Sequence, residues 1–141
     1  MAAQAWAILR HAMSEGNIEL VRAIFRGWNE DGVDGMLPLF HADIEYRPME
    51  ERGAVHGHDA MRRYFERWME PWDELQVEPT EMRSEGDRVL NGCEVRGTGS
   101  GSGVEITMHY WQVWLIHAGR AVRWEEYLDR DEAVAAFEGS G

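Results

Sequence analysis

The main change in the spacing of hydrophobic residues along this chain falls near Trp72, and that change constrains the fold more than any single motif does. Before Trp72, apolar side chains recur at every third or fourth position, as in Met61, Tyr64, Phe65 and Trp68, which is typical of an amphipathic helix. After it, apolar and polar residues alternate, which is typical of strands. Helices followed by a run of strands predict an α+β fold.

Short turn sequences separate the later segments, so we predict a meander of antiparallel strands. The expected strands cover residues 43–47, 75–83, 88–98, 104–117 and 121–128, and the expected helices cover 14–29, 34–40, 57–71 and a short segment after Asp129. The strand at 104–117 is so long that it must bend to stay covered. We therefore predict a cone-shaped, curved antiparallel sheet that packs on three helices and encloses a pocket.

Three helix starts are predicted from capping residues. Residues 1–13 have helical character and are predicted to be an N-terminal extension, with Ser14 as the N-cap of the first helix of a single domain over residues 14–141. Asp34 is the predicted cap of the short second helix. Asp129 and Glu132 have the spacing of a capping box for the terminal helix.

Charge and composition exclude several classes of partner. The chain carries 26 acidic and 14 basic residues, a net charge of -12, and phosphates of nucleic acid or of an anionic membrane would be repelled. No apolar run approaches the about 20 residues of a membrane span. The single cysteine, Cys93, allows no internal disulfide, and we expect a cytoplasmic protein. The seven tryptophans favour a thick core, a ligand wall or an interface.

Alternation within the strand at 104–117 assigns its side chains to two faces. One face carries Met108, Tyr110, Gln112 and Trp114. The other carries Trp111, Val113 and Leu115, which would be an exposed apolar patch in a monomer if this face lies on the outside of the sheet, as the family resemblance given below implies. That patch predicts a homodimer formed through the outer face of the sheet.

Several segments together resemble a known family. They are residues 17–29, 39–46, 57–60, 101–105 and 119–129. Their order and spacing resemble the SnoaL-like branch of the nuclear transport factor 2-like superfamily, which includes ketosteroid isomerase, polyketide cyclases and limonene epoxide hydrolase. The resemblance implies a cone-shaped α+β barrel, often dimeric, with a deep pocket for a small hydrophobic ligand.

The same resemblance implies a site. Residues 124–129 line up with the Trp-Arg-Asp-Tyr-Phe-Asp segment of the epoxide hydrolase, which places Glu126 at a pocket carboxylate and Tyr46 at a pocket tyrosine. A carboxylate in an apolar cavity has a raised pKa and can act as a general acid or base. We therefore predict Glu126, Tyr46 and Tyr110 as catalytic residues. The predicted pocket-lining residues are Asn91, Cys93, Met108, Gln112, Trp114, Trp124, Leu128, Trp28 and Trp68.

The sequence also departs from both enzymes. An ungapped alignment puts Cys93 and Val95 where the epoxide hydrolase has its Arg and Asp, and the tyrosine and aspartate positions of ketosteroid isomerase fall near Ile24 and at Arg47. The leading hypothesis is therefore a cofactor-free isomerase, cyclase or hydrolase acting on a small or polycyclic hydrophobic molecule. A non-catalytic small-molecule-binding domain and a dimeric partner-binding module are the alternatives.

Histidines offer a weaker alternative site. His56 and His58 lie two residues apart and His41 lies elsewhere, without the further ligands that a metal site needs. We predict no metal, and His58 fits a structural role at a helix start. Cys93 has no histidine partner in the sequence and fits a small core residue.

Overall fold

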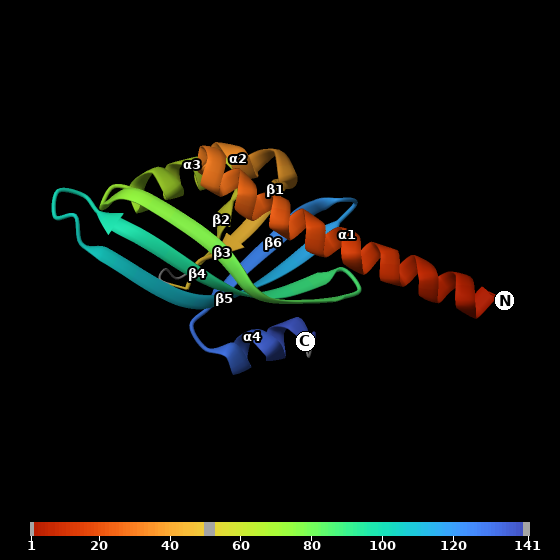
Figure 1. Ribbon diagram of the computed structural model, residues 1–141. Helices are drawn as coiled ribbons and strands as arrows, with labels where there is room; N and C mark the ends of the chain where they lie inside the picture. The colour runs from red at the N-terminus through yellow and green to blue at the C-terminus, as the bar shows by residue number, and fades with distance from the viewer. Residues whose placement is uncertain (1, 50–52, 140–141) are drawn as a thin grey trace.

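The computed structural model describes residues 2–49 and 53–139, which form an α+β fold. Figure 1 shows one curved sheet between two helical layers. Helices α1, α2 and α3 cover its inner, concave face, and α4 lies on the outer face, where it packs on β4, β5 and β6. The curved sheet against helices agrees with the prediction, and the sheet does not close into a barrel.

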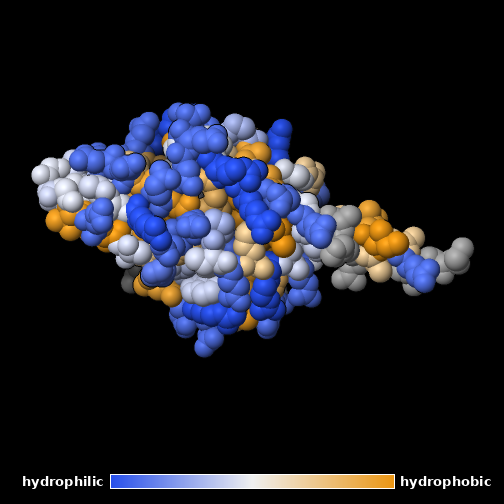
Figure 2. Space-filling model, in the orientation of Figure 1, coloured by the Kyte–Doolittle hydropathy of each residue, from blue (hydrophilic) through white to orange (hydrophobic). Residues whose placement is uncertain are grey.

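The first helix is one continuous element. The helices are α1 Ala2–Asp31, α2 Val33–Met36, the 3₁₀ helix η1 Leu37–Leu39, α3 Gly57–Trp68 and α4 Arg130–Phe137. The prediction that Ser14 begins a helix is wrong, because the Ala-rich residues before it are good helix formers and continue the same helix. The N-terminal part of α1 projects beyond the sheet (Figure 1), and Ile8, Leu9 and Met13 are exposed on it. Figure 2 shows hydrophobic residues on this projection, beside the mainly polar surface of the body.

The second helix is shorter than predicted. Gly32, with φ 64°, is its N-cap in place of Asp34, which lies in the first turn and pairs with Arg62 at 3.0 Å. Pro38 cannot donate an α-helical hydrogen bond, so the chain tightens into η1 and enters β1 at Phe40. Gly35 touches Gly27 of α1 so closely that a Cβ added to Gly35 would lie 1.9 Å from the Gly27 carbonyl oxygen. This contact requires glycine.

The sheet has six strands in the order β2-β1-β6-β5-β4-β3. They are β1 Phe40–Arg47, β2 Val55–His56, β3 Trp72–Glu85, β4 Arg88–Gly99, β5 Glu105–His117 and β6 Arg120–Tyr127. Neighbouring strands are antiparallel except β1 and β6, which are parallel. A parallel pair requires a long connection, and α3 with four strands supplies it.

Irregular pairing bends the sheet around the pocket. The β3–β4 register shifts between Pro79 and Met82, and a further shift separates Leu115 from Ile116 in β5. Such bulges bend a strand and increase its twist. Pro79 is tolerated because β3 is an edge strand, where the missing N–H interrupts no second ladder.

The outer face of the sheet is covered more than the sequence predicted. Val113 is only 4% exposed, because α4 packs over it with Ala133 and Phe137. The Asp129 side chain caps α4 by accepting from the Asp131 N–H at 3.1 Å. The expected exposed patch is therefore wrong at Val113, while Trp111 and Leu115 are half-buried. The homodimer stays a prediction. No helix within residues 2–49 and 53–139 is long and apolar enough to cross a membrane.

Candidate functional site

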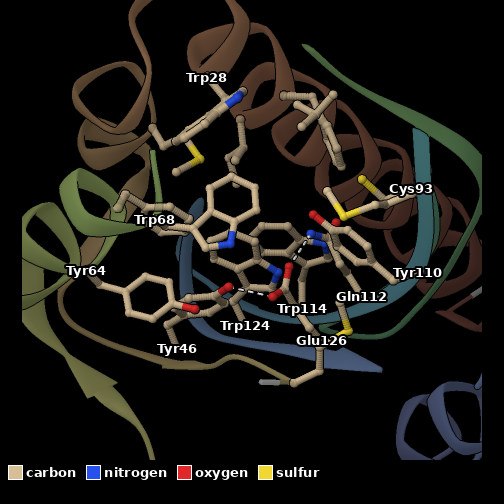
Figure 3. A pocket seen from close by; sticks show the side chains of 17 residues that line it. Trp28, Tyr46, Tyr64, Trp68, Cys93, Tyr110, Gln112, Trp114, Trp124 and Glu126 are labelled. Atoms are coloured by element: carbon tan, nitrogen blue, oxygen red, sulfur yellow. Dashed lines mark hydrogen bonds between the residues drawn. The ribbon is translucent and has the colours of Figure 1, made fainter. Parts of the chain in front are cut away.

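A narrow cavity lies between α1, α3 and the inner face of the sheet, and Figure 3 shows the side chains around it. Its wall is mostly aromatic. The rings belong to Phe25, Trp28, Tyr46, Tyr64, Phe65, Trp68, Tyr110, Trp114 and Trp124. The space open to the centres of water molecules is about 50 Å³, well below the about 300–1,000 Å³ of typical drug-sized sites. In this conformation the cavity therefore suits a small molecule and has no room for a polycyclic one.

One carboxylate, that of Glu126, lies in this aromatic wall. Tyr46 donates its hydroxyl hydrogen to Glu126 Oε1 at 2.5 Å, and Gln112 Nε2 donates to Oε2 at 3.1 Å. Strand pairing sets both contacts. Gln112 lies directly opposite Glu126 in the antiparallel β5–β6 pair, and the parallel β1–β6 pair brings Tyr46 beside Trp124.

A chain of hydrogen bonds continues from the carboxylate into the core. Asn91 Nδ2 donates to Gln112 Oε1 at 3.0 Å, and Trp114 Nε1 donates to Asn91 Oδ1 at 2.7 Å. Asn91 is 0% exposed and Gln112 is 2% exposed. Each amide both donates and accepts, so the chain fixes the orientation in which Gln112 presents its N–H to Glu126.

Stacked rings hold the wall of the cavity in place. The Trp124 ring lies 4.1 Å from Tyr46 and 4.7 Å from Trp114, measured between ring centroids, at interplanar angles of 29° and 11°. The two tryptophans differ in their hydrogen bonds. Trp114 donates to Asn91, whereas the buried Trp124 Nε1 has no hydrogen-bond partner among the residues that the structure describes.

Burial keeps two other pocket groups protonated. Burial raises the pKa of Tyr46 well above its usual value, and the negative charge of the nearby Glu126 carboxylate adds a smaller rise. Tyr46 therefore stays a hydrogen-bond donor at neutral pH. Burial also raises the pKa of the Cys93 thiol to about 12. A neutral thiol is a weak nucleophile, so Cys93 lines the cavity as a small apolar group.

Two of the candidate histidines, His58 and His41, make local hydrogen bonds to the backbone. His58 Nε2 lies 3.1 Å from the Phe40 carbonyl oxygen, and the Asp43 N–H donates to His41 Nδ1 at 3.0 Å. Within residues 2–49 and 53–139 no group of three or more His, Cys, Asp or Glu side chains could hold a metal ion.

The family model for the SnoaL-like domain matches residues 21–124, most of the chain. The chain belongs to the SnoaL-like domain family. No protein with a curated description matches the sequence. Solved structures with similar folds number in the hundreds.

Three of these structures illustrate the range of proteins with this fold. TerC, co-crystallised with polyporic acid, is 23% identical with a TM-score of 0.72, over 88% of this chain and 99% of TerC. A protein from Jannaschia sp. CCS1, assigned as a SnoaL-like polyketide cyclase, is 17% identical with a TM-score of 0.72, over 91% of this chain and 95% of that protein. SalBIII, an epoxide hydrolase/cyclase-like enzyme of pyran ring formation in the polyether salinomycin, is 19% identical with a TM-score of 0.71, over 83% and 93%.

The structure brings most of the predicted site residues of this SnoaL-like domain to one cavity. They are Glu126, Tyr46, Tyr110, Cys93, Met108, Gln112, Trp114, Trp124, Trp28 and Trp68. The prediction that Leu128 lines the pocket is wrong. Leu128 is 73% exposed, because β6 ends at Tyr127 and the strand alternation stops there. Asn91, also predicted to line the pocket, lies behind Gln112 and does not border the cavity.

Several residues of the cavity wall, on α3, on α2 and in the loop after β1, were not predicted from the sequence. Tyr64 and Phe65 line the cavity from α3, and Met36 and Met49 line it from the segments around β1. Tyr64 and Phe65 belong to the predicted apolar stripe of that helix, so the signal for their inward orientation was present. The stripe alone does not separate residues that fill a core from residues that border a cavity.

Proposed function

We propose that this protein is a cofactor-free pocket enzyme in which Glu126 transfers a proton to or from a small, mainly apolar molecule. Isomerisation, cyclisation and hydrolytic ring opening all need such a step. The observation that carries the proposal is the Glu126 carboxylate, oriented by Tyr46 and Gln112 in a wall of aromatic rings. A side chain positioned by hydrogen bonds in a largely apolar site is typical of a general acid or base.

The hydrogen bonds assign distinct roles to the neighbours. Tyr46 remains a donor because burial raises its pKa, so it holds the Glu126 carboxylate and does not compete with it as a base at neutral pH. Gln112 is held in turn by Asn91 and cannot rotate freely. Both are positioning residues in this proposal. SalBIII, an epoxide hydrolase/cyclase-like enzyme of pyran ring formation that shares this fold, supports the reaction class.

Proton transfer can be tested without the natural substrate. Cyclohexanone is a single-ring ketone, and a general base in the cavity would speed the exchange of its α-hydrogens with deuterium in D₂O. We expect the protein to accelerate this exchange, measured by loss of the α-hydrogen NMR signal. We expect Glu126→Gln to slow the protein-dependent rate by about 100-fold or more, the usual contribution of a general base.

Glu125→Gln is the matched control. Glu125 is the next residue on β6, its side chain points to the opposite face, and it lies 3.7 Å from Arg47 on the exterior. Its replacement should leave the exchange rate unchanged. Equal exchange rates in the Glu126→Gln variant and the unmodified protein would refute the role of Glu126.

The alternative function is non-catalytic binding of a small apolar molecule. The aromatic wall and the small enclosed space favour it, since both serve binding as well as catalysis. The same experiment separates the two functions. A binding module would bind cyclohexanone, seen as shifted protein resonances, without accelerating its deuterium exchange.

A further inference from the structure

The indole N–H of Trp124 is an unused hydrogen-bond donor beside the proposed site. Trp124 is 5% exposed, and its Nε1 is buried without a partner among residues 2–49 and 53–139. Buried polar groups in native proteins are almost always hydrogen-bonded, and a buried tryptophan N–H usually finds an acceptor. A donor left without one loses the hydrogen bonds that water would give it in the unfolded chain.

The neighbouring tryptophan shows that this sheet can supply an acceptor. Trp114 stacks 4.7 Å from Trp124, and its own N–H donates to Asn91 at 2.7 Å. Trp124 cannot readily turn to find an equivalent, because Tyr46 and Trp114 stack on its ring and Phe65 lies parallel to it at 5.8 Å. The direction of its N–H is therefore fixed by packing.

The position of this donor connects it with the proposed site. Trp124 lines the cavity and lies two residues before Glu126 on β6, so both side chains belong to the same face of the sheet (Figure 3), with backbones about 7 Å apart along the strand. One small molecule can therefore reach both groups. The N–H lacks contact with the solvent, so a ligand that binds it must first displace wall side chains, and the flexible Met36, Met49 and Met108 border the same cavity.

We propose that the Trp124 indole N–H donates a hydrogen bond to an uncharged acceptor oxygen, of the carbonyl or ether type, on a small ligand of the cavity. The inference rests on the proposed function, because it takes the cavity to be the substrate site. It adds the substrate class: a compact apolar molecule that carries one acceptor oxygen near the atom on which Glu126 acts. A pure hydrocarbon leaves the donor without a partner and is discriminated against.

Two probes of nearly the same shape isolate this hydrogen bond. Cyclohexanone carries an acceptor oxygen where methylenecyclohexane carries a CH₂ group. We expect Trp124→Phe, which keeps an aromatic ring and removes the N–H, to shift the ratio of the two dissociation constants about tenfold toward methylenecyclohexane. Trp111→Phe, on the outer face under Arg130, is the matched control and should leave the ratio unchanged.

A second readout needs no variant. In ¹⁵N-labelled protein, the indole N–H resonance of Trp124 should move downfield with cyclohexanone and stay in place with methylenecyclohexane. An unchanged ratio in Trp124→Phe, or the same resonance shift with both probes, would overturn the donor assignment. If that happens while Glu126→Gln still slows deuterium exchange, the proposed function stands and only this inference fails. If neither probe binds to the unmodified protein, both fail.

Discussion

Each face of the sheet contributes to a buried cluster of residues, and the two clusters differ in their chemistry. On the outer face, α4 covers a small apolar cluster of Leu90, Val113, Ala133 and Phe137. On the inner face, aromatic rings surround a cavity, and a chain of hydrogen bonds runs from Trp114 to Glu126. The outer cluster buries only apolar side chains, while the inner face combines packing with polar groups held in fixed directions.

Loss of the outer cluster should cost the most stability and the least binding. Phe137→Ala removes a ring that is 3% exposed, and we expect the free energy of unfolding to fall by about 3–4 kcal/mol. Chemical denaturation measures this loss. The dissociation constant for cyclohexanone should stay within about twofold, because α4 does not border the cavity. A large loss of binding in a variant that remains folded would break the distinction between the faces.

Asn91→Leu tests whether the inner polar chain is structural at its buried end. Asn91 is 0% exposed, and the change removes the hydrogen bonds that it makes with the Trp114 N–H and with Gln112 Oε1. We therefore expect a loss of about 2–3 kcal/mol in the free energy of unfolding. Unlike Phe137→Ala, it should also weaken cyclohexanone binding, since Gln112 is released from its fixed orientation. Unchanged binding would show that Asn91 contributes to stability only and that the orientation of Gln112 does not depend on it.

High pH should weaken the inner face through its raised pKa values. The pKa of Cys93 rises from about 9 in the unfolded chain to about 12 in the fold, so folding holds its proton and that contribution is complete below pH 9. Between pH 9 and 11 the unfolded chain loses the proton first, and stability should fall by about 2 kcal/mol from this group. Tyr46 adds a further fall above pH 10. Cys93→Ala should flatten the decline measured by denaturation at several pH values; an unchanged slope would contradict the assignment.

The smallest stability effect should come from Glu126, the residue to which we assign the largest role in the proposed function. Glu126→Gln keeps the size of the side chain. Its amide oxygen can accept from Gln112 Nε2 while its NH₂ group donates to the Tyr46 hydroxyl oxygen, so the free energy of unfolding should change by less than about 1 kcal/mol. Its melting temperature should therefore stay near that of the Glu125→Gln control. A loss as large as that of Asn91→Leu would class Glu126 with the structural residues.

The sequence predicted the helices and the later strands because their hydrophobic periods are long and distinct. Alternation on β5 grouped Met108, Tyr110, Gln112 and Trp114 on one face, and the family resemblance identified that face as the pocket side and added Glu126 and Tyr46. The prediction for Leu128 was wrong because alternation carries no signal for where a strand ends. The parallel pairing of β1 with β6 is a long-range contact, and no local pattern encodes it.

Three further features depend on packing that periodicity does not contain. Val113 was expected on the surface because nothing in its own strand predicts that α4 folds back over it. The difference between Trp114 and Trp124 lies in one hydrogen bond to Asn91, which lies on the neighbouring strand β4, 23 residues before Trp114, and no local sequence pattern predicts that contact. The size of the cavity depends on how far the aromatic rings fill it, and sequence spacing does not predict how side chains fill a space.

Deuterium exchange into cyclohexanone, compared between the Glu126→Gln and Glu125→Gln variants, tests the central claim most directly. The two variants make the same chemical change on adjacent residues of β6, one facing the cavity and one facing away. At saturating ketone, the account predicts exchange about 100-fold slower in Glu126→Gln than in Glu125→Gln. Equal rates in the two variants would contradict it.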